Sequence, residues 1–213
     1  MRRPPRPHLS APMILDAAAR VLAREGHAGL TMRAVAGELG VQAPAIYWHF
    51  QDKQALELAL YDHLMGDLTF APAGRDWRED VRKMASALRR KLTAHRDMGR
   101  LIPVGFFFAP YSMALLDTAM GVLMRAGLSA HDAGYGFTTL FDYVANWARC
   151  EAELRARPHG ARPGLDEAAK AAIARAYPNV AAVFAAFPGP GDLDEQFAFG
   201  LDLLIAGLER RTR

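Results

Sequence analysis

The sequence has little of what stabilises secreted or membrane proteins. It contains one cysteine, Cys150, among 213 residues, and a single thiol cannot form an internal disulfide or a metal site of several cysteines. No apolar stretch approaches the roughly 18 residues that suggest a membrane span, and no segment resembles a signal peptide. We therefore expect a cytoplasmic protein that has no membrane partner and is held together by packing.

Arrangements of residues that carry catalysis are also lacking. No nucleophile with a base, pair of carboxylates or metal-binding cluster stands at a telling spacing, and His95, His131 and His159 are scattered. The one positive neighbour of Cys150 is Arg149, so a buried structural thiol is favoured over a reactive one. We predict no enzymatic activity, no cofactor and no metal, and a helical enzyme that uses Cys150 is the remote alternative.

The net charge is small but unevenly distributed. The chain has 26 basic and 23 acidic side chains, a net charge of +3, which is too low to indicate a nucleic-acid partner by itself. Residues 1–53 hold seven of the basic and four of the acidic side chains, so this segment carries the whole net charge. The basic end of the protein is its N-terminus.

The N-terminal part of the chain has the pattern of a helix-turn-helix domain. Residues 1–9 are proline-rich and basic, which predicts a mobile arm. Residues 10–53 then contain three short helical patterns. Ser10 is expected to cap the first, which ends at Gly26. The other two are joined by a glycine turn, and this arrangement is typical of a helix-turn-helix.

Start and stop signals define the second and third helices of this domain. Thr31 is expected to cap a helix that ends at Gly40. Pro44 suits the first turn of the next helix, because its missing amide proton is not needed there. That helix, 43–49, ends in Tyr47, Trp48 and His49, and three consecutive large aromatic side chains cannot all face one small core. At least one faces outward, although Tyr47 and Trp48 as packing anchors remain the alternative.

The rest of the chain, residues 54–213, also has helical periodicity. No segment shows the alternating pattern of a strand, and Gly and Pro separate the helical patterns. The patterns cover 53–67, 76–95, 111–126, 130–156 and 192–211. The predicted class is all-α, with a domain boundary near residue 53.

Several of these segments together resemble the TetR family of transcriptional regulators. The run 29–41, the segment Pro-Ala-Ile-Tyr-Trp-His-Phe at 44–50, and 53–56 look like the family's DNA-binding signature. Residues 199–209 are similar to the last helix of its tetracycline-repressor-like subgroup, so the resemblance covers nearly the whole chain. It implies a homodimeric, ligand-responsive repressor of double-stranded operator DNA. The helix-turn-helix would be carried on an effector-binding and dimerisation domain.

The resemblance also implies roles for individual side chains at the DNA. Arg33 would reach a guanine edge, and Pro44 with Tyr47 would contact thymine methyl groups or nearby backbone. Three further positions match those that the family uses on phosphates, and their side chains are hydrogen-bond donors. These are Trp48, His49 and Lys53.

Two positions of the third helix depart from the tetracycline repressor. Ala43 and Ala45 stand where that repressor has an amide-bearing and a hydroxyl-bearing side chain, so the operator should differ. Gln42 is a candidate for an adenine contact, and a solvated turn residue is an equal alternative.

Two helices carry apolar stripes that the family uses for dimerisation through a four-helix bundle. In 130–156 the stripe comprises Phe137, Leu140, Phe141, Val144 and Trp147. In 192–211 it comprises Phe197, Leu201, Leu204, Ile205 and Leu208. The alternative is that both stripes belong to the core of a single chain.

The family resemblance places an effector pocket inside the helical domain. Its expected lining is Thr69, Met84, Leu88, Phe106, Phe107, Phe108, Ala119, Met120, Trp147 and Cys150. This lining is strongly apolar and favours a small apolar or aromatic ligand over magnesium-tetracycline. Residues 100–110 contain no histidine for a metal, and Cys150 stands at the position of a carboxylate. Plain core packing of Phe106–Phe108, and a DNA-binding dimer without a ligand or controlled by a protein partner, remain alternatives.

Overall fold

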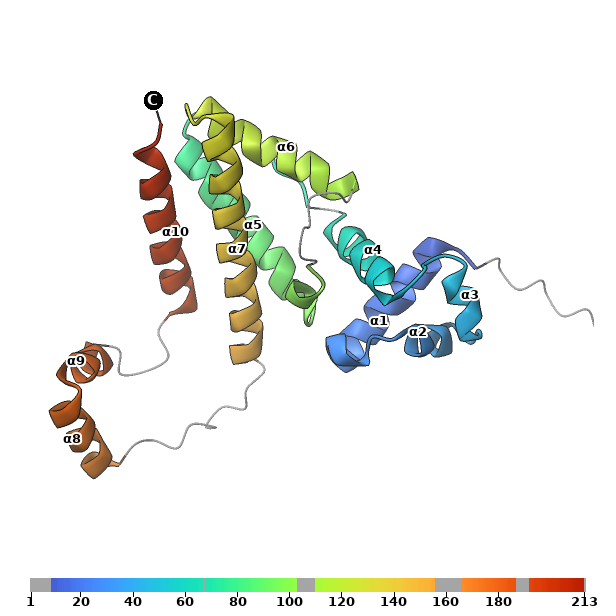
Figure 1. The fold of residues 1–213 in the computed structure, drawn as a ribbon, viewed down its shortest axis with the longest axis horizontal. Helices are drawn as coiled ribbons and strands as arrows, with labels where there is room; N and C mark the ends of the chain where they lie inside the picture. The colour runs from blue at the N-terminus through green and yellow to red at the C-terminus, as the bar shows by residue number, and fades with distance from the viewer. Residues whose placement is uncertain (1–8, 67, 103–109, 156–165, 187–191, 213) are drawn as a thin grey trace, which may run out of the picture.

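The computed structural model describes residues 9–66, 68–102, 110–155, 166–186 and 192–212, and Figure 1 shows its path. Across these ranges the chain forms ten α-helices and one 3-10 helix and has no strand, which confirms the predicted all-α class. The helices are α1 (Ala11–Gly29), α2 (Met32–Leu39), α3 (Ala43–Tyr47), α4 (Lys53–Met65), α5 (Trp77–Ala94), η1 (Met98–Arg100), α6 (Pro110–Arg125), α7 (Ala130–Arg155), α8 (Glu167–Ala176), α9 (Pro178–Ala186) and α10 (Leu193–Glu209). Of the predicted arm, 1–9, residues 1–8 lie outside the described residues.

Helices α1, α2 and α3 form a small three-helix unit, which we call the reading head. Its core includes the fully buried side chains of Ile14, Val21, Val35 and Ile46. The hydroxyl of Thr31 accepts a hydrogen bond from the amide of Ala34 at 3.1 Å, so α2 is capped as the sequence predicts. The head lies at one end of the molecule (Figure 1).

Helix α1 differs from the prediction in its N-cap and in a short turn added after Gly26. Ser10 occupies the N-cap position, but its side chain makes no capping hydrogen bond. Gly26 has φ 75° and ψ −179°, so the regular helix ends there as predicted, and a further short helical turn beyond this kink runs on to Gly29. Glycine is the one residue type that adopts this backbone conformation without strain.

Helix α4 connects the reading head to the larger helical body. Asp52 caps it by accepting the amide of Ala55 at 2.8 Å. Leu56, Leu60 and Tyr61 are fully buried. Because α4 packs against both α1 and α6, a movement of the body can reach the head through it.

The body consists of α5, α6, α7 and α10, and ion pairs fix how α10 lies on α5. Three arginines of α5 pair with three carboxylates of α10 in antiparallel order. The pairs are Arg78 with Glu209, Arg82 with Asp202 at 2.8 Å, and Arg89 with Asp194 at 2.8 Å. Phe197, Leu201 and Ile205 of α10 are buried behind this row. The apolar face and the ion pairs therefore specify one register.

Helices α8 and α9 were not predicted from the sequence. They pack against each other and lie apart from the other helices (Figure 1). No residue of α8 is buried, while Tyr177 and Val183 are more than half exposed. Their alanine-rich sequence lacks the apolar stripe from which the other helices were recognised.

Candidate DNA-binding and effector-binding sites

The last residues of α3 and its C-cap form an exposed aromatic surface. Ile46 is fully buried and anchors the helix, whereas Tyr47 is 51% and Trp48 is 89% exposed. An indole with so little contact to its own chain does not stabilise the fold by burial. Packing anchors were the alternative for these two aromatics, and the exposure of Trp48 argues against that role.

Other candidate DNA contacts surround this surface. Arg33 lies exposed in the first turn of α2, and Gln42, Pro44 and His49 are exposed around α3. Ala43 and Ala45 are half-buried. Lys53, at the start of α4, is half-exposed, and its Nζ lies 3.2 Å from Oε1 of Glu57. The exposed polar atoms thus lie on α2, α3 and the start of α4.

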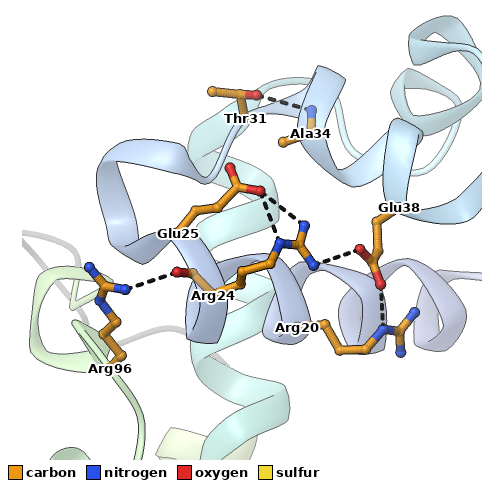
Figure 2. A network of polar contacts seen from close by, with 7 residues as sticks. All are labelled: Arg20, Arg24, Glu25, Thr31, Ala34, Glu38 and Arg96. Atoms are coloured by element: carbon orange, nitrogen blue, oxygen red, sulfur yellow. Dashed lines mark hydrogen bonds and ion pairs between the residues drawn. The ribbon is translucent and has the colours of Figure 1, made fainter.

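A network of ion pairs joins α1 to α2 within the head (Figure 2). Glu38 of α2 accepts from Nε of Arg20 at 2.8 Å and from Nη1 of Arg24 at 2.9 Å. Hydrogen bonds from Arg20 and Arg24 lower the pKa of the Glu38 carboxyl. Glu25 and then Glu38 raise the pKa of the Arg24 guanidinium. The network fixes α2, and with it Arg33, relative to α1.

A cavity of about 50 Å³ lies between α5, α6 and α7. Every side chain around it is apolar. The lining consists of Phe70, Val81, Met84, Ala85, Leu88, Ala119, Leu123, Phe137, Leu140, Phe141 and Val144. A charged group placed here would lose its hydration without gaining a partner, so the cavity suits an apolar molecule.

A second cavity of about 30 Å³ lies beside the first and reaches α4. It is lined by Tyr61, Met65, Phe70, Leu88, Leu115, Leu116, Phe137 and Phe141. Phe70, Leu88, Phe137 and Phe141 line both cavities, and the rings of Phe137 and Phe141 are stacked with centroids 5.9 Å apart. Burial, and then the charge of Asp62, raise the pKa of Tyr61, so its phenol is neutral at pH 7.

Comparison with known proteins identifies the family of this chain. The family model of the bacterial regulatory proteins of the tetR family matches residues 14–60, and that of the tetracyclin repressor-like C-terminal domain matches residues 71–212. This chain belongs to the TetR family. Its members are regulators and not enzymes, and the chain is a DNA-binding transcriptional repressor of this family.

Named relatives of this TetR-family repressor extend over most of its length. The tetracycline repressor protein class A from transposon 1721 of Escherichia coli is 33% identical over 201 residues, which is 93% of this chain and 89% of that repressor. The structure of the Streptomyces coelicolor TetR family protein ActR in complex with actinorhodin matches with a TM-score of 0.80 and 27% identity, and covers 94% of this chain and 96% of ActR. The structure of BioQ with its double-stranded DNA operator matches with a TM-score of 0.70 and 27% identity, over 95% of this chain and 99% of BioQ.

The residues expected around the effector lie in three different places. Met84, Leu88 and Ala119 line the larger cavity. Phe106, Phe107 and Phe108 lie outside the described residues. Thr69, Met120, Trp147 and Cys150 line neither cavity: Thr69 is exposed, Met120 and Cys150 are half-buried, and Trp147 packs against the ring of Phe197 on α10.

Several residues that line the cavities were not predicted from the sequence, notably Phe70, which lines both. Phe137, Leu140, Phe141 and Val144 were assigned to the dimer stripe, yet they line the larger cavity. Helical spacing could have placed these four on one face of α7, but it could not tell which neighbour this face meets.

Most of the stripe predicted on α10 also faces its own chain. Phe197, Leu201 and Ile205 are buried, and Leu204 and Leu208 are half-buried. The outward surface of α7 and α10 carries different apolar side chains. These are Tyr135, Phe199 and Leu203, exposed by 67%, 68% and 60%.

The described parts of the chain offer no clustered metal ligands. They contain no group of three or more His, Cys, Asp or Glu side chains that could hold a metal ion. Among the described helices, none has both the length and the hydropathy to cross a membrane.

Proposed function

We propose that this repressor binds a palindromic operator as a homodimer and is released by a small, uncharged, largely apolar or aromatic molecule. The proposed class of ligand rests on the side chains that line the two adjoining cavities. Eleven apolar side chains surround the larger one. Filling it with apolar surface removes that surface from water, which is the main source of affinity in such pockets.

The exposed residues of the reading head support operator binding. In a helix-turn-helix the second helix enters the major groove, and flanking donors contact phosphates. Tyr47 and Trp48 at the end of α3, with Arg33 on α2, are free to do so. Arg33 and Tyr47 would read base edges, with Pro44 and Gln42 beside them, while Trp48, His49 and Lys53 anchor the backbone.

The outward face of α7 and α10 supports a dimer. Phe199 and Leu203 lie one turn apart on α10, and Tyr135 lies on α7. Large apolar side chains that gather on a surface mark an interaction site. A second copy that packs its own α7 and α10 here would cover them in a four-helix bundle and place two heads on one palindrome.

The ligand would act on the head through α4. Tyr61 and Met65 of α4 line the smaller cavity, Leu56 and Leu60 of the same helix are buried, and α4 packs against α1 of the head. A ligand that fills both cavities would displace at least one of the four side chains that line both, such as Phe137 or Phe141. Since α4 forms part of the wall of the smaller cavity, it would shift with them. The ligand shifts the equilibrium only as far as it binds the two states with different affinity.

Footprinting on the DNA that flanks the gene tests the operator. We expect the purified protein to protect a palindromic site there at moderate salt, and a failure to protect any palindrome would refute the repressor proposal. Once the site is known, fluorescence anisotropy with a panel of neutral aromatic compounds tests release.

A variant with a smaller cavity makes the release test specific. Ala119 is buried and lines the larger cavity. Ala119→Leu should keep operator binding but lose release, whereas Ala94→Leu, at an exposed position of α5, should keep both. If no compound releases the wild-type protein from its operator, a dimer that is independent of small ligands is the better description.

A further inference from the structure

The effector domain also holds the reading head directly, at a point beside α4, where Nε2 of His27 lies 2.8 Å from Oε1 of Glu57 on that helix. The backbone amide of His27 donates a hydrogen bond to Oδ2 of Asp97 at 2.9 Å. Nη1 of Arg96 donates to the backbone carbonyl of Arg24 at 2.9 Å. Figure 2 shows Arg96 reaching the end of α1 from the segment that follows α5. We call Arg24, His27, Arg96 and Asp97 the clasp.

The backbone on both sides is shaped for this close approach. Gly26, between the two α1 partners, has φ 75° and is buried. A Cβ atom at this position would lie 2.7 Å from Oδ2 of Asp97 and 3.1 Å from Nε of Arg96. Asp97 itself has φ 56°, in the left-handed region that side chains rarely adopt. Such conformations persist where surrounding contacts hold them.

On the head side, the clasp continues to the DNA-reading helices. Arg24 offers its carbonyl to Arg96, while its guanidinium pairs with Glu38 of α2 at 2.9 Å. Arg20 holds the same carboxylate at 2.8 Å. Since α2 carries Arg33, the position of Arg96 bears on the position of a predicted base contact through two consecutive hydrogen bonds.

On the body side, the clasp is fixed to the helix that forms the cavity. Leu92, near the end of α5, is buried one turn after the cavity residue Leu88. Met98 and Leu101, which follow Asp97, are also buried. Arg96 and Asp97 are therefore attached firmly to the body, and Nη1 of Arg96 and Oδ2 of Asp97 bind the head.

We propose that Asp97 and Arg96 are positioning residues for operator recognition. They set the orientation of the head on the effector domain, so that the two heads of a dimer fit one spacing of half-sites. This inference rests on the proposed palindrome-binding dimer. It adds a second connection between body and head, alongside α4, that touches no base and no phosphate.

Two substitutions remove the hydrogen bonds of the clasp without adding backbone strain. Asp97→Gly removes the acceptor and leaves a residue that prefers positive φ. Arg96→Met removes the donor from an exposed side chain, so the fold should be retained. Arg90→Met is the matched control, because Arg90 is an exposed arginine within α5, about one and a half turns before the clasp.

The readout is the preference for half-site spacing. Operator affinity is measured on the natural palindrome, on one with two base pairs inserted at its centre, and on a single half-site. We expect Asp97→Gly and Arg96→Met to reduce the preference for the natural spacing about tenfold. Half-site affinity and the thermal midpoint of Arg96→Met should match those of Arg90→Met.

The outcomes distinguish the inference from the proposed function. Unchanged spacing preference in both variants would overturn the positioning role. An equal loss of affinity on the half-site would also overturn it, because the head itself would then be damaged. If the wild-type protein shows no preference for a palindrome at all, it is the proposed operator mode that fails.

Discussion

Arg89 of α5 and Glu151 of α7 form a buried ion pair, with 2.7 Å between Nε and Oε2. The same guanidinium pairs with Asp194 of α10 and lies over the ring of Phe197 at 4.6 Å from its centroid. Glu151 is only 2% exposed, and Arg155 also pairs with it at 2.5 Å. One arginine therefore connects three helices of the body.

We predict that Glu151→Ala destabilises the protein by about 3 kcal/mol, because it leaves Arg89 buried with only the exposed Asp194 as a charged partner. Urea unfolding measures this loss. Glu153→Ala is the control, since Glu153 is a partly exposed glutamate on the same helix that pairs with Arg149 and Arg100, and it should cost less than about 1 kcal/mol. Similar losses for both variants would show that burial does not determine how much the ion pair of Arg89 and Glu151 contributes to the free energy of unfolding.

The DNA-binding surface yields a prediction about two exposed side chains. Arg33→Ala should weaken binding to the operator about tenfold or more and leave nonspecific binding nearly unchanged, because it removes a base contact. Trp48→Ala should weaken both kinds of binding, because it removes a phosphate contact. Both side chains are exposed, so neither variant should lower the thermal midpoint noticeably. Equal losses on all sequences for Arg33→Ala would exclude a base-reading role.

Local signals explain how much of the fold could be predicted from the sequence. Thr31 and Gly40 act within a few residues of themselves, so the cap and the end of α2 were predicted correctly. The clasp could not be predicted, because His27 and Asp97 meet across 70 positions of the chain. Gly26 illustrates both cases. The glycine was recognised as a signal for the end of a helix, but its close approach to Asp97 is a tertiary contact that local sequence does not reveal.

The candidate sites divide in the same way. A motif of consecutive residues placed Tyr47 and Trp48 on a reading surface, and both are exposed. The effector lining draws on α5, α6 and α7 together, and the direction in which each face of α7 points is decided by packing. Trp147, expected in the pocket, packs against Phe197 instead.

The exposed face of α10 predicts how the proposed dimer can be broken. Leu203→Glu should convert a dimer to a monomer and abolish binding to a palindrome, because a carboxylate would be buried in the interface without a partner. Sedimentation velocity measures the change. Met124→Glu on α6 replaces another exposed apolar residue, 46% accessible, and should remain dimeric. A Leu203→Glu protein that stays dimeric would place the interface elsewhere.

The ion pairs of Glu38 predict that the stability of the reading head falls at acidic pH. Its pKa is lowered from the ordinary value of 4.5, first by Arg20 and then by Arg24. A lowered folded pKa contributes stability that is present above the unfolded value and is lost as pH falls through the folded one. The difference in thermal midpoint between wild type and Glu38→Gln should therefore be present at neutral pH and shrink below about pH 4.5. High salt should reduce it at neutral pH as well, and a difference that grows on acidification would contradict the sign.

The apolar cavities lead to a prediction about tetracycline with magnesium. A chelated metal needs oxygen or nitrogen ligands, and the lining of the larger cavity supplies none from its side chains. The smaller cavity adds only Tyr61, whose phenol is neutral at pH 7 and whose pKa burial raises further. We therefore expect magnesium-tetracycline to leave the operator complex intact at concentrations that release the Escherichia coli class A repressor from its own operator. Anisotropy of labelled operator measures this with the two proteins side by side. Release of both at the same concentration would show that the pocket accepts a metal chelate and that its apolar lining does not decide the ligand.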